Sequence, residues 1–197
     1  MMIETAGTQV SAVNAAAGLN KLLQISGGAV YTDKREVIEF DISTRLKALD
    51  EVIEETEQKV IVFVPYRHTI EVVARHLTDN NVSIAIIQGD VSATQRAQII
   101  NMFQTMDEPR VLVVQPQSAS HGVTLTRADT VVFWSPVMSV ETYLQCIARM
   151  DRVGQVNKMT VVHLQGSEVE KKMYAMLQGK VDMHTKLVDL YREEIES

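Results

Sequence analysis

Residues 60–64 read Val60-Ile61-Val62-Phe63-Val64, five apolar residues in a row. A strand with one face in water alternates apolar and polar residues, whereas a strand buried on both faces of a parallel sheet is apolar throughout. Parallel strands need a long crossover connection, usually a helix. The run therefore predicts an α/β fold in which helices cover both faces of a parallel sheet.

The sequence on either side of this run repeats the alternation of strand and helix. Just before it, residues 43–57 carry Leu46, Leu49, Val52 and Ile53 at helical spacing. Strands that alternate with helices of about 10–15 residues indicate right-handed βαβ units, and hence a three-layer α/β sandwich. The other predicted strands are residues 84–87, 111–114, 130–134 and 159–164, and the other predicted helices are residues 67–78, 93–105 and 140–152.

The two ends of the chain are predicted to add helices to this sandwich. Residues 10–25 favour a helix that Gly27-Gly28 interrupts, and residues 29–31 favour a short extended piece. Ser167, followed three residues later by Glu170, has the pattern of a capping box, and a last helix is expected at residues 182–196. We divide the chain into an arm or linker (1–40), the α/β domain (41–180) and a C-terminal helix (181–197).

Composition excludes several classes of protein. The 25 acidic and 19 basic residues give a net charge of −6, so any contact with nucleic acid must come from a local site rather than from bulk charge. Cys146 is the only cysteine, which excludes an internal disulfide and favours a buried, inert thiol. The histidines show no metal-ligand spacing. No apolar run is long enough for a membrane span and no signal peptide is visible, so we expect a soluble, cytoplasmic protein without membrane contact.

The most informative motif is QCIARMDRVGQ, residues 145–155. In a helix, Gln145, Arg149 and Arg152 would fall at i, i+4 and i+7 and share one face. Two neighbouring guanidinium groups repel each other unless an anion lies beside them, and the planar guanidinium fork suits phosphate oxygens. Spacing alone leaves a solvated polar face with ordinary ion pairs as an equal alternative.

The residue pattern favours the phosphate-binding interpretation, because it resembles motif VI of Snf2-type proteins at Gln145, Arg149, Arg152, Gly154 and Gln155. Residues 59–65 look like motif IV of the same family. Residues 87–103 are similar to its G-x-x-S-x-x-x-R segment, and residues 111–129 look like motif V. These blocks occur in the family's order between about residues 44 and 178. The chain thus resembles the second RecA-like lobe of a superfamily-2 DNA helicase or translocase.

The resemblance implies a role for individual residues. Arg152 would be an arginine finger that reaches the γ-phosphate of ATP, with Arg149 as its support. Gln145, Gly122 and Thr124 would lie on the nucleotide side, where Gly122 allows close backbone approach. The phosphates of a DNA strand, without sequence readout, would contact the loops that follow the strands; the residues concerned are Tyr66, Arg67, Gln88, Gly89, Gln117 and Ser118.

The chain departs from the family pattern at some positions of motif V. Thr124 stands where the family usually has Asn or Asp, and the sequence before Gly122 is Ser118-Ala-Ser-His121 rather than the family's small, glycine-rich stretch. We interpret His121 as a loop residue lining an interface, because no partner for catalysis stands at a recognisable spacing. Trp134, at a strand end, favours core packing over base stacking.

No segment has the form G-x-x-x-x-G-K-[ST], and no acidic pair suited to Mg²⁺ follows the family pattern. ATP and Mg²⁺ would therefore be held mainly by a first lobe, present in cis or in trans, and we expect this chain alone to be inactive as an ATPase. The compact pattern favours a phage or bacterial source. Two other hypotheses are a stand-alone module that binds DNA or protein without ATP, and a RecA-like fold used only as a scaffold.

Overall fold

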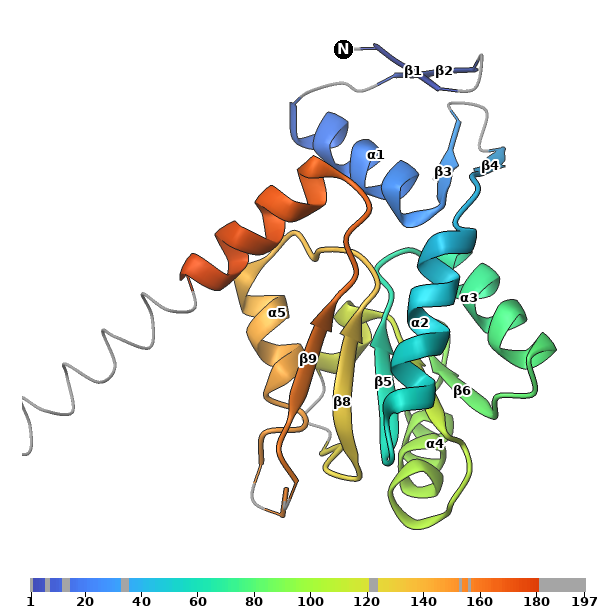
Figure 1. Ribbon diagram of the computed structural model, residues 1–197, viewed down its shortest axis with the longest axis vertical. Helices are drawn as coiled ribbons and strands as arrows, with labels where there is room; N and C mark the ends of the chain where they lie inside the picture. The colour runs from blue at the N-terminus through green and yellow to red at the C-terminus, as the bar shows by residue number, and fades with distance from the viewer. Residues whose placement is uncertain are drawn as a thin grey trace, which may run out of the picture.

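Five parallel strands form the central sheet of the computed structural model, which describes residues 2–5, 8–11, 15–32, 36–120, 124–152, 154–155 and 157–180 (Figure 1). The strand order is β6-β7-β5-β8-β9, and each neighbouring pair is parallel. The apolar run of the sequence lies in β5, at the centre of the sheet, where all its residues are buried. The strands are β5 (Lys59–Phe63), β6 (Ile84–Ile87), β7 (Val111–Val114), β8 (Ala128–Phe133) and β9 (Thr160–His163).

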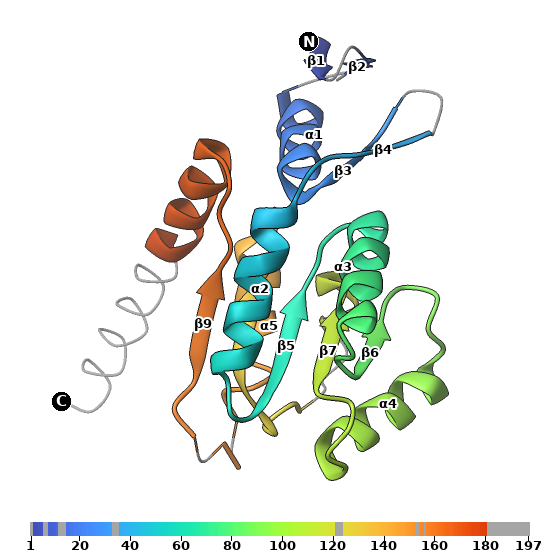
Figure 2. The same cartoon turned by 45° about the vertical axis from the view of Figure 1, so that its right-hand side comes forward.

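Helices cover both faces of this sheet, which confirms the predicted three-layer α/β sandwich. Val60 and Val62 of β5 point to the face covered by α2 (Ser43–Glu55) and α3 (Arg67–Asp79). Ile61 and Phe63 point to the opposite face, which buries residues of α4 (Ala93–Thr105), of α5 (Val140–Ile147) and of a helix at residues 168–180 (Figures 1 and 2). Each face thus has its own apolar core, and the alternating side chains of β5 serve both.

Helix α5 is shorter than the sequence predicts. It ends at Ile147 rather than at residue 152, and its C-cap, Ala148, still has helical backbone angles. Beyond it the amide of Met150 bonds to the carbonyl of Ile147, a tighter i→i−3 pattern that turns the chain away from the helix axis. The two arginines of the motif therefore lie in a turn, which we call the arginine turn (residues 148–152 and 154–155), and they do not share a helix face with Gln145.

The N-terminal residues form two small antiparallel hairpins with a helix between them. The hairpins pair β1 (Met2–Thr5) with β2 (Thr8–Ser11), and β3 (Ala29–Tyr31) with β4 (Val37–Glu39), while the helix is α1 (Ala15–Gly27). The predicted helix at residues 10–25 was therefore wrong at its start, because residues 8–11 pair as a strand. The break at Gly28 is confirmed, and its positive φ of 108° is a backbone conformation that favours glycine.

Helix α1 and strand β3 lie on the α/β domain, over the carboxyl ends of the central strands (Figures 1 and 2). Leu23 and Val30 are buried. The indole Nε1 of Trp134 donates a 2.8 Å hydrogen bond to the carbonyl of Gly27, and the ring of Trp134 is fully buried, which confirms its prediction as a core residue. Residues 15–31 are thus packed against the domain that they precede, while the predicted boundary near residue 40 stays a prediction.

The C-terminal part of the domain begins with the predicted cap. The hydroxyl of Ser167 accepts a hydrogen bond from the amide of Glu170, and residues 168–180 are helical. The predicted helix at residues 182–196 lies outside the described residues. Among the helices that the structure describes, none has the length and apolar character needed to cross a membrane.

Candidate nucleotide and nucleic-acid interface

Most of the predicted site residues that the structure describes fall into two groups, at opposite ends of the strands of the central sheet. The first group follows the carboxyl ends of β5, β6 and β7, where the sequence places its DNA contacts. There the guanidinium of Arg67 forms an ion pair with Asp90, which joins the loops after β5 and β6. The amide of Gly89 donates a 3.2 Å hydrogen bond to the side-chain oxygen of Gln115, which joins the loops after β6 and β7. Three loops distant in sequence thus form one polar surface, which we call the carboxyl edge.

Two of the residues predicted to contact DNA at the carboxyl edge are largely buried. The hydroxyl of Tyr66 donates a 2.9 Å hydrogen bond to the side chain of Asn20 in α1, and burial raises the pKa of this phenol well above its usual value. Ser118 lies in the short 3₁₀ helix η1 (Pro116–Ser120) and is 5% exposed. Tyr66 therefore links its loop to α1, while Ser118 has little surface exposed for a phosphate.

The other predicted contacts at this edge are more accessible. Arg67 and Asp90 are each about half exposed, with side chains at 53%, and Gln117 is exposed on η1. Gln88 is half buried, and its side-chain oxygen has no hydrogen-bond partner among the residues that the structure describes. Beside them a pocket of about 210 Å³ opens between the N-terminal elements and the lobe. Its lining residues are Gln24, Ala29, Tyr31, Pro65, Tyr66, Arg67, His68 and Gln115.

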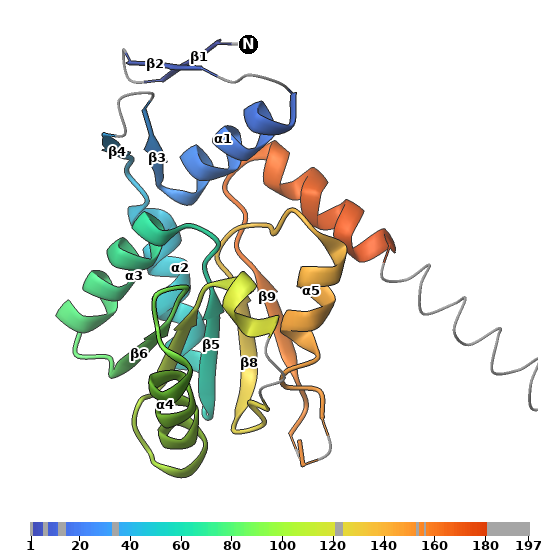
Figure 3. The ribbon, with the colours of Figure 1, turned by 180° about the vertical axis from the view of Figure 1, so that it is seen from behind.

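The second group lies at the amino end of β8. Helix α5 follows β8 and packs back along it, so the arginine turn returns to the edge where β8 begins (Figures 1 and 3). The amide of Leu125 donates a 2.8 Å hydrogen bond to the carbonyl of Arg149, and the side-chain amide of Gln155 donates one of 2.8 Å to the carbonyl of Ala128. The arginines therefore lie at the amino end of β8, away from the loops that were expected to contact DNA.

The structure brings Arg152 and Thr124 together across these segments. The Nη1 atom of Arg152 lies 3.1 Å from the hydroxyl oxygen of Thr124, and its Nε donates a 3.2 Å hydrogen bond to the carbonyl of Ala148. A guanidinium has no acceptor atoms, so the threonine hydroxyl accepts from the arginine. The sequence had suggested both residues for the nucleotide side, but it gave no sign of this direct contact. Gly122 and His121 lie outside the described residues.

Arg149 is buried beside Arg152. Only 7% of Arg149 is exposed, and within the described part of the chain its Nε has no hydrogen-bond partner and its guanidinium has no carboxylate partner. Burial lowers the pKa of Arg149 below its usual value, and the positive charge of Arg152 lowers it further. A buried cation without a partner is costly, so this arrangement is suited to an anion supplied from outside the described residues.

Gln145 does not join this pair. It lies on α5, half buried, and its side-chain amide donates a 3.1 Å hydrogen bond to Glu141 one turn earlier. The shared face predicted for Gln145 and the two arginines is absent because α5 ends before Arg149. Cys146, on the same helix, is fully buried, and burial raises the pKa of its thiol to about 12, so the prediction of an inert core cysteine is confirmed.

The residues around this geometry match a known family. The profile of the helicase conserved C-terminal domain matches residues 44–154, more than half of the chain. The chain belongs to this helicase C-terminal domain family. The match contains both the carboxyl edge and the arginine turn up to Gly154, so both groups of candidate residues are part of the family's domain.

Relatives of this helicase C-terminal domain include two human proteins. One is the E3 ubiquitin-protein ligase SHPRH, 31% identical over 64% of this chain and 7% of the relative. Another is the DNA annealing helicase and endonuclease ZRANB3, 25% identical over 71% of this chain and 13% of the relative. The chain thus spans a small part of the length of these relatives. The predicted phage or bacterial source finds no support in these two relatives and stays a prediction.

The fold of the helicase C-terminal domain also has a solved counterpart. The C-terminal part of the Fun30 ATPase domain superposes with a TM-score of 0.63 at 17% identity, over 68% of this chain and 44% of that chain. At this identity the similarity establishes the fold alone. It confirms the predicted RecA-like sheet with helices on both faces.

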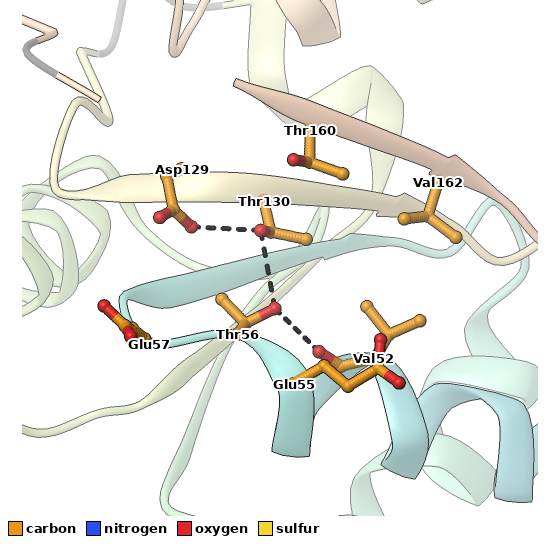
Figure 4. A pocket seen from close by; sticks show the side chains of 8 residues that line it. All are labelled: Val52, Glu55, Thr56, Glu57, Asp129, Thr130, Thr160 and Val162. Carbon is orange, nitrogen blue, oxygen red and sulfur yellow. Dashed lines mark hydrogen bonds between the residues drawn. The ribbon is translucent and has the colours of Figure 1, made fainter. Parts of the chain in front are cut away.

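A further pocket of the domain has the wrong charge for a phosphate. It has a volume of about 410 Å³ and lies between α2, β8 and β9 (Figure 4). Its lining includes the carboxylates of Glu55, Glu57 and Asp129, and the hydroxyl of Thr130 donates to Asp129 at 3.0 Å. Among the described residues, no group of three or more His, Cys, Asp or Glu side chains is arranged to hold a metal ion. This pocket therefore does not compete with the arginine turn for a phosphate.

Proposed function

We propose that this chain is the second motor lobe of an ATP-dependent DNA helicase or translocase. In this proposal Arg152 and Arg149 face the terminal phosphate of an ATP molecule held, with Mg²⁺, by a first RecA-like lobe in cis or in trans. The residues of the carboxyl edge form part of the path of a DNA strand. The observation that carries the proposal is Arg149, a nearly buried guanidinium beside a second guanidinium, with no carboxylate partner among the described residues.

The physical argument starts from electrostatics. Arg149 and Arg152 repel each other, and burial weakens the screening that water would provide. A triphosphate oxygen between or beside them would relieve both costs, and charge that develops on the transferred phosphoryl group would be stabilised in the same way. An arginine in such a position is worth roughly 10³–10⁵ in rate. The sequence holds no phosphate loop of its own, so the nucleotide must be presented by another lobe.

The relatives agree with this assignment at a coarser level. One relative is named a DNA helicase, and the solved counterpart is named as part of an ATPase domain. A stand-alone binding module is less well supported, because a net charge of −6 gives little bulk attraction for DNA and because the chain belongs to a helicase domain family. In the proposed function, Arg67, Gly89 and Gln117 would bind the phosphates of the DNA strand through local contacts rather than through bulk charge.

The proposal is tested by ATP turnover of the two-lobe protein, in which this chain is combined with a first lobe that carries the phosphate loop. We expect Arg152→Ala to lower kcat at least about 10³-fold while ATP binding is retained. The matched control is Arg75→Ala, which removes an exposed arginine of α3 and should leave turnover unchanged. Equal turnover of the Arg152→Ala variant and the parent would refute the assignment of the arginine.

The isolated chain provides a second test. We expect no ATP turnover by this chain alone, with or without duplex DNA, because it lacks the nucleotide-holding segments. DNA-stimulated turnover by the isolated chain that disappears with Arg152→Ala would mean that an ATP site exists within it, and the two-lobe assignment would be wrong.

A further inference from the structure

Several hydrogen bonds join the segment that carries Thr124 to the turn that carries Arg152. The amide of Leu125 bonds to the carbonyl of Arg149, and the amide of Ala128 bonds to the carbonyl of Leu125 at 3.3 Å. From the other side, the backbone amide of Gln155 bonds to the carbonyl of Arg152 at 2.9 Å, and its side chain bonds to the carbonyl of Ala128. These contacts fix the distance between the hydroxyl of Thr124 and the arginine turn.

Within this frame the guanidinium of Arg152 donates from different nitrogens to acceptors in both segments. Its Nη1 donates to the Thr124 hydroxyl at 3.1 Å and its Nε donates to the Ala148 carbonyl at 3.2 Å. Because the guanidinium is a rigid planar fork, two acceptors on different nitrogens define the direction of its plane. The Ala148 carbonyl belongs to the same turn as Arg152, whereas the Thr124 hydroxyl ties the side chain to another segment.

We propose that Thr124 is a positioning residue for Arg152, and that its hydroxyl sets the orientation of the guanidinium without neutralising it. This inference rests on the proposed function, and it replaces the sequence-based expectation that Thr124 contacts the nucleotide directly. The chemistry favours a hydroxyl for this task. A hydroxyl is a neutral acceptor, so it accepts a hydrogen bond from the guanidinium and leaves the charge of Arg152 intact.

Two substitutions test this role in the two-lobe protein. Thr124→Val has almost the same shape and lacks the acceptor, whereas Thr124→Ser keeps the acceptor. Because Thr124→Val removes a hydrogen bond to a charged group, we expect it to lower kcat by about tenfold or more with little change in the KM for ATP. We expect Thr124→Ser to restore most of the turnover.

The possible outcomes each decide the matter. A kcat near that of the parent for Thr124→Val, or a Thr124→Ser variant as slow as Thr124→Val, would overturn the positioning role. A raised KM with unchanged kcat would also overturn it, since that pattern belongs to a residue that binds the nucleotide in ground state and transition state alike. Thermal unfolding of each variant identifies any loss of turnover that comes from loss of the fold.

A measurement on this chain alone distinguishes failure of the inference from failure of the proposed function. The side-chain NMR signal of Arg152 reports how freely its guanidinium rotates, and exposed Arg75 provides the reference. We expect restricted rotation of Arg152 in the parent and in Thr124→Ser, and faster rotation in Thr124→Val. Free rotation in the parent would overturn the inference whatever the ATPase does. Restricted rotation that depends on the hydroxyl, combined with full turnover of Arg152→Ala, would confirm the contact and refute the proposed function.

Discussion

Removal of the Glu170 carboxylate should destabilise the domain strongly. Glu170 is fully buried, and its Oε2 accepts hydrogen bonds from Arg45 Nη2 at 2.6 Å and from the amide of Gly166 at 2.8 Å. Arg45 is itself 8% exposed, lies over the ring of Trp134 and donates to the carbonyl of that residue. The pair thus joins α2, the end of β8 and the helix at residues 168–180.

The expected magnitude follows from burial. Removing one partner of a buried ion pair leaves the other charge uncompensated, which costs about 3–5 kcal/mol. For a domain of this size each kcal/mol lowers the melting temperature by about 2–4 °C, so we expect Glu170→Ala to melt about 10 °C below the parent. The variant Arg45→Met should lose less than Glu170→Ala, because it leaves a buried carboxylate that still accepts from Gly166, and the double variant should lose less than the sum of the two.

Urea unfolding at pH 7, with circular dichroism as the readout, measures these differences directly. The matched control is Glu51→Ala on the same helix as Arg45. Glu51 faces Lys47 at 4.0 Å, and both side chains are more than half exposed, so the loss should stay within about 0.5 kcal/mol. A loss below about 1 kcal/mol for Glu170→Ala, similar to the exposed pair, would refute the reasoning from burial.

Two further predictions concern stability. Arg110 donates from Nη1 to the carbonyls of Glu57 and Gln58 at 2.9 and 2.6 Å, and from Nη2 to the carbonyls of Ile53 and Thr56 at the end of α2. Arg110→Ala should therefore lower the free energy of unfolding, measured in urea, by about 1–3 kcal/mol. Arg110→Lys has a single ammonium group and should recover only part of this loss. The second prediction concerns His163, whose Nε2 lies 2.9 Å from the Tyr143 hydroxyl. Burial lowers the pKa of His163 in the folded protein. Below about pH 6.5 the unfolded chain therefore binds a proton more readily than the folded chain does. The free energy of unfolding should be unaffected by His163 above that pH and should fall as the pH falls, by at most about 1.4 kcal/mol per pH unit from this group. The His163→Gln variant should lose less free energy of unfolding per pH unit. An equal dependence on pH in the two proteins would contradict the assignment.

The sequence predicted the central elements well where the chemistry is local. The bounds of β6, β7 and α4 agree with the prediction. The apolar runs of the two strands are short and bounded by polar residues, and Ser92 with Gln95 forms a capping box at the start of α4. The position of Trp134 in the core also followed from its place at a strand end.

The site was predicted less completely, because its geometry depends on contacts between distant segments. No residue between Gln145 and Arg152 is a helix breaker, so the spacing fitted a continuous helix. The helix ends at Ile147, and the carbonyl of Arg149 accepts from the amide of Leu125 instead, which no local pattern reveals. The link between Thr124 and Arg152 depends on the same non-local pairing.

The placement of the two residue groups at opposite ends of the strands has a mechanical consequence. The six residues of β8 rise about 3.3 Å each, so the arginine turn and the carboxyl edge are separated by roughly 20 Å of buried, hydrogen-bonded strand. A strand paired on both sides cannot shorten or slide without breaking its ladders. The two residue groups should therefore keep a fixed separation, because β8 cannot change its length or its register while both of its ladders are intact.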